Sequence, residues 1–150
     1  SEMCIRDSAY TAHTYPHEEG MAVDGVTVAQ SMGFDPAAVF KTLVARGASK
    51  QYYVFDVPVA ENLDLKKAAK AVGEKSIEMI HQKELLPLTG YVHGGCSPVG
   101  MKKEFPTYID ETAMLFDAIA VSGGMRGVQL IVNPDQLLGF VKGEYVDLTA

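Results

Sequence analysis

The feature that most constrains the fold is a pair of strand-like runs around a short polar turn. The runs are VFKTLVAR (39–46) and QYYVFDV (51–57), and the turn between them reads GASK. Runs rich in β-branched and aromatic residues and bounded by turn residues predict two paired strands. Pro58 follows directly, and it should end the second strand because it has no N–H to donate. We therefore expect a sheet at the centre of the fold.

Further strands and short helices alternate along the rest of the sequence. Strands are predicted at 9–15, 76–80, 106–110, 116–122 and 127–132. Helices are predicted at 26–33, from Asp35 and Pro36 onward, at 65–73 after a capping Asp64, at 81–86 and at 134–141. About eight strands with short helices between them predict an α/β or α+β fold, with a mixed, barrel-like β-sheet flanked by short α-helices.

The chain is organised as one domain by its length and pattern. Its 150 residues suit a single core, and they contain no repeat or linker-like run. Residues 1–8 (SEMCIRDS) follow no hydrophobic period, so we interpret them as a non-native or disordered segment. The domain is then expected to span residues 9–150.

Composition excludes several classes of function. The net charge of −6 opposes broad, sequence-independent coating of nucleic acid, and we expect no DNA partner. No apolar run approaches the roughly 20 residues of a membrane span. The two cysteines, Cys4 and Cys96, do not make a disulfide framework. These features predict a cytoplasmic protein without a membrane partner.

The usual catalytic constellations are weak in this sequence. His13 and His17 are separated by Pro16 in a strand-like segment, and no C-x-x-C or H-E-x-x-H occurs, so no metal and no cofactor are expected. Ser97 in GCSPV lacks the second glycine of a G-x-S-x-G elbow, and its hydroxyl is expected to fix its own turn. Cys96 is expected to fill space under its loop, although a thiolate paired with His93 remains an alternative.

Two glycine-rich loops are the better candidates for a site. YVHGGCSPVG (91–100) and SGGMRG (122–127) each hold adjacent glycines, which expose backbone N–H groups without a side chain in the way. Such donors can hold a carbonyl or a developing oxyanion. Lys41 lies inside the apolar run AVFKTLV, where a lysine is unusual if both faces are buried. It either points outward or directs its cation into a pocket.

These motifs together resemble a known family. VFKTL, LDLKKAAKAVG, TGYVHGGCSPVG followed by two lysines, PTYID and VSGGMRG occur here in the order seen in YbaK-type proteins. Those are the Cys-tRNA(Pro) deacylases of the YbaK/prolyl-tRNA synthetase editing-domain superfamily. The resemblance runs from about HTYPH (13–17) to the end of the sequence. It implies a mixed barrel flanked by helices and the hydrolysis of mischarged tRNA, with prolyl-tRNA synthetase as a candidate partner.

The resemblance also implies a set of site residues. The lysine of VFKTL, here Lys41, is its key position, and the segment from Gly94 to Pro98 supplies backbone contacts near the ester. Residues with an implied catalytic role are Lys41, Gly94, Gly95 and Ser122. Residues implied to contact the substrate are Tyr15, Thr42, Pro58, Ser97, Pro98, Gly123, Gly124 and Arg126, while Lys102 and Lys103 are implied to meet tRNA phosphates.

The implied mechanism needs no protein nucleophile. The thiol of the esterified cysteine attacks its own carbonyl to give a cyclic thiolactone, and the protein orients the group and stabilises the oxyanion. Release of alanine or serine from tRNA, or a non-catalytic module that binds through Lys66, Lys67 and Lys70, remain alternatives. This sequence departs from the family pattern at Cys96, at Gln129 and in its first eight residues.

Overall fold

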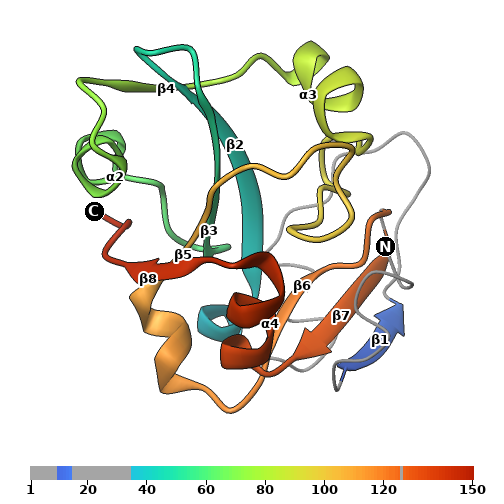
Figure 1. Cartoon of the computed structure of the whole chain (residues 1–150). Helices are drawn as coiled ribbons and strands as arrows, with labels where there is room; N and C mark the ends of the chain where they lie inside the picture. Colours follow the sequence, from blue (N-terminus) through green and yellow to red (C-terminus); the bar gives the residue numbers. More distant parts are fainter. Residues whose placement is uncertain (1–9, 15–34, 126) are drawn as a thin grey trace.

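The fold is described by a computed structural model, which covers residues 10–14, 35–125 and 127–150. Its helices and strands are labelled in Figure 1. The strands are β1 (Tyr10–Thr14), β2 (Phe40–Gly47), β3 (Tyr52–Pro58), β4 (Ile77–Met79), β5 (Thr107–Asp110), β6 (Ile119–Ser122), β7 (Val128–Val132) and β8 (Glu144–Val146). The helices are α2 (Leu65–Val72), α3 (Gln82–Thr89) and α4 (Pro134–Val141), with 3-10 turns η2 (Pro36–Ala38) and η3 (Glu111–Leu115).

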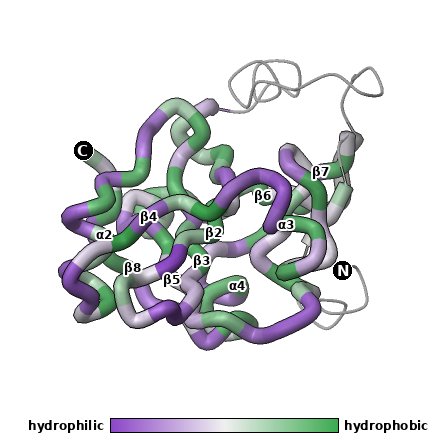
Figure 2. Tube along the Cα trace, turned by 90° about the horizontal axis from the view of Figure 1, so that it is seen from above, coloured by the Kyte–Doolittle hydropathy of each residue, from purple (hydrophilic) through white to green (hydrophobic). Residues whose placement is uncertain are grey.

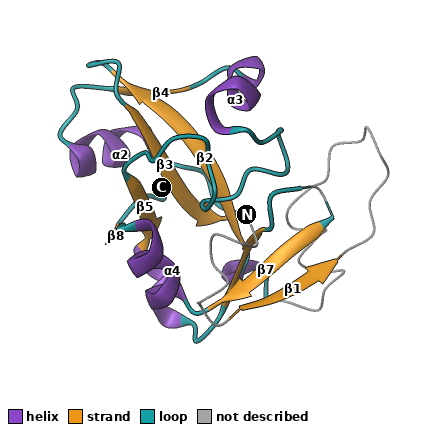
Figure 3. Ribbon diagram, turned by 45° about the vertical axis from the view of Figure 1, so that its right-hand side comes forward, coloured by secondary structure: helices purple, strands orange, loops and turns teal. Residues whose placement is uncertain are grey.

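The strands form two sheets. Five strands are ordered β4-β2-β3-β5-β8, and three are ordered β1-β7-β6. The β2–β3 pair is the predicted antiparallel hairpin, while β5 lies parallel to both β3 and β8. The sheets meet at one isolated parallel bridge, between Val39 and Ala120. The mixed α+β architecture is thus confirmed, but within the described residues the two sheets do not close into one barrel (Figure 3).

Helix ends follow the predicted capping signals. The side chain of Asp64 accepts from the backbone N–H groups of Lys66 and Lys67, and Gly73 ends α2 in the left-handed region at φ 76°. Pro134 opens α4 in the predicted way, after a cap that was not predicted, in which the Asn133 side chain accepts from the Gln136 N–H. Asp35 and Pro36, by contrast, begin only a 3-10 turn, because β2 starts directly after it.

Two other boundaries differ clearly from the prediction. Helix α3 continues through Pro87 to Thr89 and ends at Gly90, where φ is 88°. Pro87 is exposed and lies near the end of a short helix, so the loss of its one backbone hydrogen-bond donor is tolerated. Strand β6 starts at Ile119 rather than at 116, since Phe116 caps the 3-10 turn η3. The helix predicted at 26–33 and the segment 1–8 lie outside the described residues.

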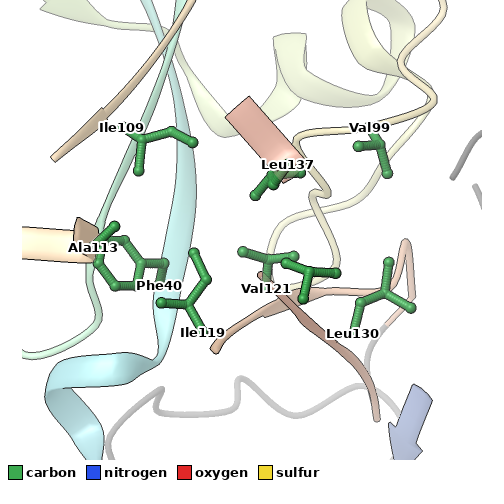
Figure 4. Close-up of a cluster of buried hydrophobic side chains, with 9 residues drawn as sticks. Phe40, Val99, Ile109, Ala113, Ile119, Val121, Leu130 and Leu137 are labelled. Atoms are coloured by element: carbon green, nitrogen blue, oxygen red, sulfur yellow. The ribbon is translucent and has the colours of Figure 1, made fainter. Parts of the chain in front are cut away.

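The apolar core is divided by the β2–β3 hairpin. Phe40 on one face of β2 packs with Ile109, Ile119 and Leu130 (Figure 4). On the opposite face, Ala45 and Phe55 pack against the buried alanines of α2, as the i, i+3, i+4 pattern predicts. Figure 2 shows hydrophobic colouring gathered around the central strands. No helix in the described ranges is long and apolar enough to cross a membrane.

The last strand completes the five-stranded sheet. β8 pairs with β5, and the carboxylate of Asp110 accepts from the backbone N–H of Leu148 at 2.9 Å. Leu148 is fully buried beside Phe55. The ammonium of Lys67 contacts the Asp147 carboxylate and the Thr149 carbonyl. Residues 144–149 are therefore bound to the sheet and to α2.

Candidate functional site

The glycine-rich loop between α3 and β5 is folded against one face of the hairpin. Cys96 packs with Val44 and Val54 of the central strands, which places the loop over that face (Figure 3). The Tyr91 hydroxyl donates to the Val99 carbonyl at 2.5 Å, so the two ends of the turn are tied together. Gly94 has φ 85°, a conformation that favours glycine. The loop is a defined structure rather than a bare linker.

Serine and cysteine in this loop have structural contacts. Ser97 is fully buried, and its hydroxyl accepts from the Val99 N–H at 3.3 Å, so it fixes its own turn as predicted. Cys96 is 7% exposed, and burial, followed by the charge of Asp56, raises the pKa of its thiol to about 12. His93 is exposed. A thiol of this pKa is a poor nucleophile, which disfavours catalysis by Cys96.

The backbone amides of the loop are partly engaged. The Gly95 N–H donates to the Val92 carbonyl at 3.0 Å within the turn. Pro98 and Val99 are buried, and Gly100 begins the exit toward β5 at φ 72°. Of the two adjacent glycines, Gly94 is therefore the better placed to offer its N–H to a substrate.

Asp56 is a buried carboxyl that sequence reasoning missed. It lies on β3 opposite Thr42, whose hydroxyl donates to Asp56 Oδ1 at 2.5 Å. Asp56 Oδ2 is buried and has no hydrogen-bond partner in the part of the chain that the structure describes. Burial raises the pKa of Asp56 to about 7, against the smaller opposing effect of the Thr42 bond. The sequence sign of a buried carboxyl was the aspartate inside the apolar run YYVFDV, but alternation alone could equally place that aspartate on an exposed face.

Lys41 and Ser122 belong to a different face. Side chains alternate along a strand, so Val39 and Lys41 point away from the face of Thr42. Val39 packs with Ala120, and Ser122 follows Ala120 by two residues on β6, on the same face. Lys41 is half-buried. Along the chain it lies between Val39, which bridges to β6, and Ala45, where the pairing of β2 with β4 begins. Strand alternation therefore places Lys41 and Ser122 on one side of the sheets, and Thr42 on the side of the glycine-rich loop.

The second glycine turn carries Ser122, Gly123 and Gly124. Gly123 N–H donates to the Val128 carbonyl at 2.9 Å, and a Cβ at Gly123 would lie 2.6 Å from a Val128 methyl carbon. Gly124 has φ 100°, and its N–H donates to the Ser122 hydroxyl at 3.3 Å. Both glycines are therefore required by the turn itself.

The remaining predicted residues are distributed around these elements. Pro58 is buried at the end of β3, opposite Phe40. Lys102 packs over Gly90, and both Lys102 and Lys103 are exposed. Tyr15 and Arg126 lie outside the described residues. Within the described ranges there is no group of three or more His, Cys, Asp or Glu side chains that could hold a metal ion.

Gln129 is the cross-strand partner of Ser122. It is 7% exposed, and its buried Oε1 has no hydrogen-bond partner among the described residues. Its position on β7 puts it on the same side of the sheet as Ser122. The sequence singled out Gln129 only as a departure from the family pattern.

A pocket of about 420 Å³ lies behind the glycine-rich loop. One wall runs from Pro98 to Thr107, and the other is the C-terminal end of α4. Lys103 lines this pocket, but Lys41 does not. The predicted residues Pro98 and Lys103 are therefore brought together at a site that the sequence did not indicate.

Comparison with known proteins identifies the family. The family model of the aminoacyl-tRNA editing domain matches residues 17–140. The chain belongs to the aminoacyl-tRNA editing-domain family. The resemblance drawn from the sequence motifs is thereby confirmed.

Relatives of this editing domain support the same assignment. The chain is 46% identical over 123 residues to a candidate Cys-tRNA(Pro)/Cys-tRNA(Cys) deacylase, EbsC, of Enterococcus faecalis, covering 82% of this chain and 75% of that protein. It is 26% identical over 112 residues to YwhH of Bacillus subtilis, which has no assigned function, and the match covers 75% of this chain and 71% of YwhH. A crystal structure of a candidate trans-editing enzyme for prolyl tRNA synthetase superposes with a TM-score of 0.87 at 25% identity, over 99% of this chain and 94% of the other.

Proposed function

We propose that this editing domain is a trans-editing deacylase that releases cysteine from mischarged tRNA(Pro). The observation that carries the proposal is the 46% identity to a protein named for that activity, over 82% of this chain. A synthetase pocket shaped for proline cannot strongly exclude the similarly small cysteine, so a second site that removes it is needed. Prolyl-tRNA synthetase is then a candidate partner, and the cytoplasm is the place of action.

The proposed reaction uses the thiol of the substrate. The cysteine sulfur attacks its own ester carbonyl, the ribose oxygen leaves and takes up the proton lost by the thiol, and a cyclic thiolactone is released for hydrolysis by water. The low nucleophilicity of Cys96 supports a mechanism without a protein nucleophile. The protein would contribute orientation and stabilisation of the oxyanion.

Roles within the protein follow the residues that the family pattern marks. Lys41 and Ser122 would contact a phosphate or a ribose of the substrate rather than the ester carbonyl, because alternation puts them on the face of the sheet opposite the glycine-rich loop. We assign the backbone donor to Gly94 rather than to Gly95, because the Gly95 N–H already donates to Val92. Thr42 holds Asp56 through its hydroxyl and would support the loop from below.

Hydrolysis of charged tRNA(Pro) tests the proposal. The wild-type protein should release cysteine from Cys-tRNA(Pro) faster than the spontaneous rate, Lys41→Ala should lose this activity, and Cys96→Ser should keep it. The cysteinyl, alanyl, seryl and prolyl esters of the same tRNA form the substrate panel. Rapid release of alanine would exclude a required thiol attack, and protection of charged tRNA would indicate a binding module instead. Loss of activity in Cys96→Ser with a folded protein would refute the mechanism.

A further inference from the structure

The pocket behind the glycine-rich loop has a shape and location suited to a ligand. Its volume of about 420 Å³ lies within the range of about 300–1,000 Å³ that is usual for small-molecule sites. It is built by two segments far apart in sequence, the loop before β5 and the end of α4 (Figure 1). Pro98 belongs both to the pocket and to the turn proposed to hold the ester. A molecule in the pocket would therefore lie next to that turn.

The walls of the pocket combine aromatic and cationic side chains. Phe105 comes from the loop and Phe140 from α4, and Phe140 is 42% exposed. Lys103 and Lys142 stand on the two opposite walls, and both are exposed. Aromatic faces and lysine ammoniums together are what proteins use to bind single-stranded nucleic acid, where bases stack and phosphates are neutralised.

Lys142 holds an unusual backbone conformation. Its φ is 54° at the residue that ends α4, a left-handed position where glycine or asparagine is favoured. The next residue, Gly143, is itself a glycine. This conformation ends α4 at Lys142, so that the residue lies on the wall of the pocket.

Charge complementarity decides the kind of occupant. The chain carries a net charge of −6, so two lysines facing one cavity form a local cationic site on an acidic protein. A purely apolar or cationic ligand would not use them. Glu104, the acid on this wall, is exposed, and a carboxylate can accept hydrogen bonds from the amino group of a base.

We propose that this pocket binds an unpaired nucleotide of the tRNA acceptor end, on the 5′ side of the esterified adenosine. The base stacks on Phe140 and Phe105, and Lys103 and Lys142 contact the flanking phosphates. This inference rests on the proposed function, because it takes charged tRNA as the substrate. It adds a subsite that would hold the acceptor strand while the ester lies at the glycine-rich turn.

Binding of uncharged RNA tests the subsite without any chemistry. The probe is a fluorescent single-stranded RNA that ends in CCA, titrated with the full chain at several salt concentrations. Phe140→Ala should weaken binding by about tenfold or more, since stacking on one aromatic residue accounts for such a factor. Lys142→Gly should reduce the slope of log K against log salt by about 0.7, the value for one phosphate contact on a single strand. Glycine suits the left-handed position, so this variant keeps the backbone.

Matched controls separate the pocket from general effects. Leu86→Ala on α3 removes an apolar side chain that is 50% exposed, and Lys75→Ala, between α2 and β4, removes an exposed lysine outside the pocket. Both controls should bind the RNA like the wild type. Phe140→Leu, which keeps an apolar side chain without a ring, should bind as weakly as the alanine variant.

The outcomes also separate this inference from the proposed function. Lys41→Ala should bind the RNA normally while losing deacylation. If the wild-type protein deacylates Cys-tRNA(Pro) but the pocket variants leave both RNA affinity and KM unchanged, the subsite is refuted and the function stands. If the variants lose RNA binding in a protein that shows no deacylation, the subsite stands and the function fails. Loss of co-elution with prolyl-tRNA synthetase, without loss of RNA binding, would assign the pocket to a protein partner and refute the subsite.

Discussion

Replacing Asp56 by asparagine should remove a large pH dependence from the stability of this protein. The pKa of Asp56 rises from its ordinary value of 3.8 to about 7, chiefly because the side chain is fully buried. Between these two values the folded state keeps a proton that the unfolded state has lost. The free energy of unfolding therefore falls as pH rises through this window, by at most about 1.4 kcal/mol per pH unit. Above about pH 8 both states are ionised and the loss is complete.

The size of the effect follows from the two pKa values. Integrated from pH 5 to pH 8, the ionisation of Asp56 lowers the free energy of unfolding by roughly 3 kcal/mol. For a domain of 150 residues this corresponds to roughly 6–12 °C in Tm. In Asp56→Asn the amide oxygen can still accept from Thr42, and the amide NH₂ carries no charge. Burial of this NH₂ group without an acceptor costs about 1–3 kcal/mol, and that cost does not vary with pH.

Urea denaturation of the wild type and of Asp56→Asn, at half-unit steps from pH 5 to pH 8, measures the effect. Ionisation of the surface glutamates Glu74, Glu78 and Glu84, whose pKa values are lowered by their hydrogen bonds, occurs in both proteins and cancels in the difference. The stability of the variant relative to the wild type should rise by roughly 3 kcal/mol across the range. Thr42→Val removes a bond that lowers the pKa of folded Asp56, and should extend the upper end of the window to higher pH. A difference that stays constant with pH would show that Asp56 does not hold a proton in the fold.

Two further predictions concern the glycine-rich loop. Tyr91→Phe should lower the free energy of unfolding in urea by about 1–3 kcal/mol, because the buried Val99 carbonyl loses its donor. Tyr145→Phe should cost less than about 1 kcal/mol, because the hydroxyl of the half-buried Tyr145 donates to the exposed Asp135 carboxylate. Equal losses would contradict the proposed tie across the loop. The pKa of the Cys96 thiol is about 12, against an ordinary 9.0, so Cys96 should react with iodoacetamide at pH 7.5 roughly a thousandfold more slowly in the folded protein than in urea. Peptide mass mapping, which separates Cys96 from Cys4, measures both rates. Rapid labelling of the folded protein would restore Cys96 as a candidate nucleophile.

Local sequence signals predicted the elements because those elements depend on local chemistry. The β2–β3 hairpin follows from two β-rich runs around a polar turn, and α2 follows from Asp64, Gly73 and the apolar spacing between them. The structure reproduces both. The division into two sheets was not predictable, because the bridge from Val39 to Ala120 joins residues 81 positions apart and has no local signature.

The candidate site shows the same limit. Glycines and a lysine in an apolar run marked the loops and Lys41, but the face to which each points depends on register. Asp56 was read as part of a strand, since one acid at an alternating position fits an exposed face equally well. The pocket requires Phe140 and Lys142 to approach the loop before β5, and that contact comes only from tertiary packing. The catalytic roles of Lys41, Gly94 and Ser122 stay predictions.

The parallel pairing of β8 with β5 has a consequence for the order of events during synthesis. β5, the neighbour of β3, keeps one edge open until residues 144–146 have been made, and Leu148 is needed to fill the space beside Phe55. A nascent polypeptide that has emerged only through β7 would present that uncovered edge to chaperones or to other chains. Completion of this sheet should therefore wait until translation has passed Leu148.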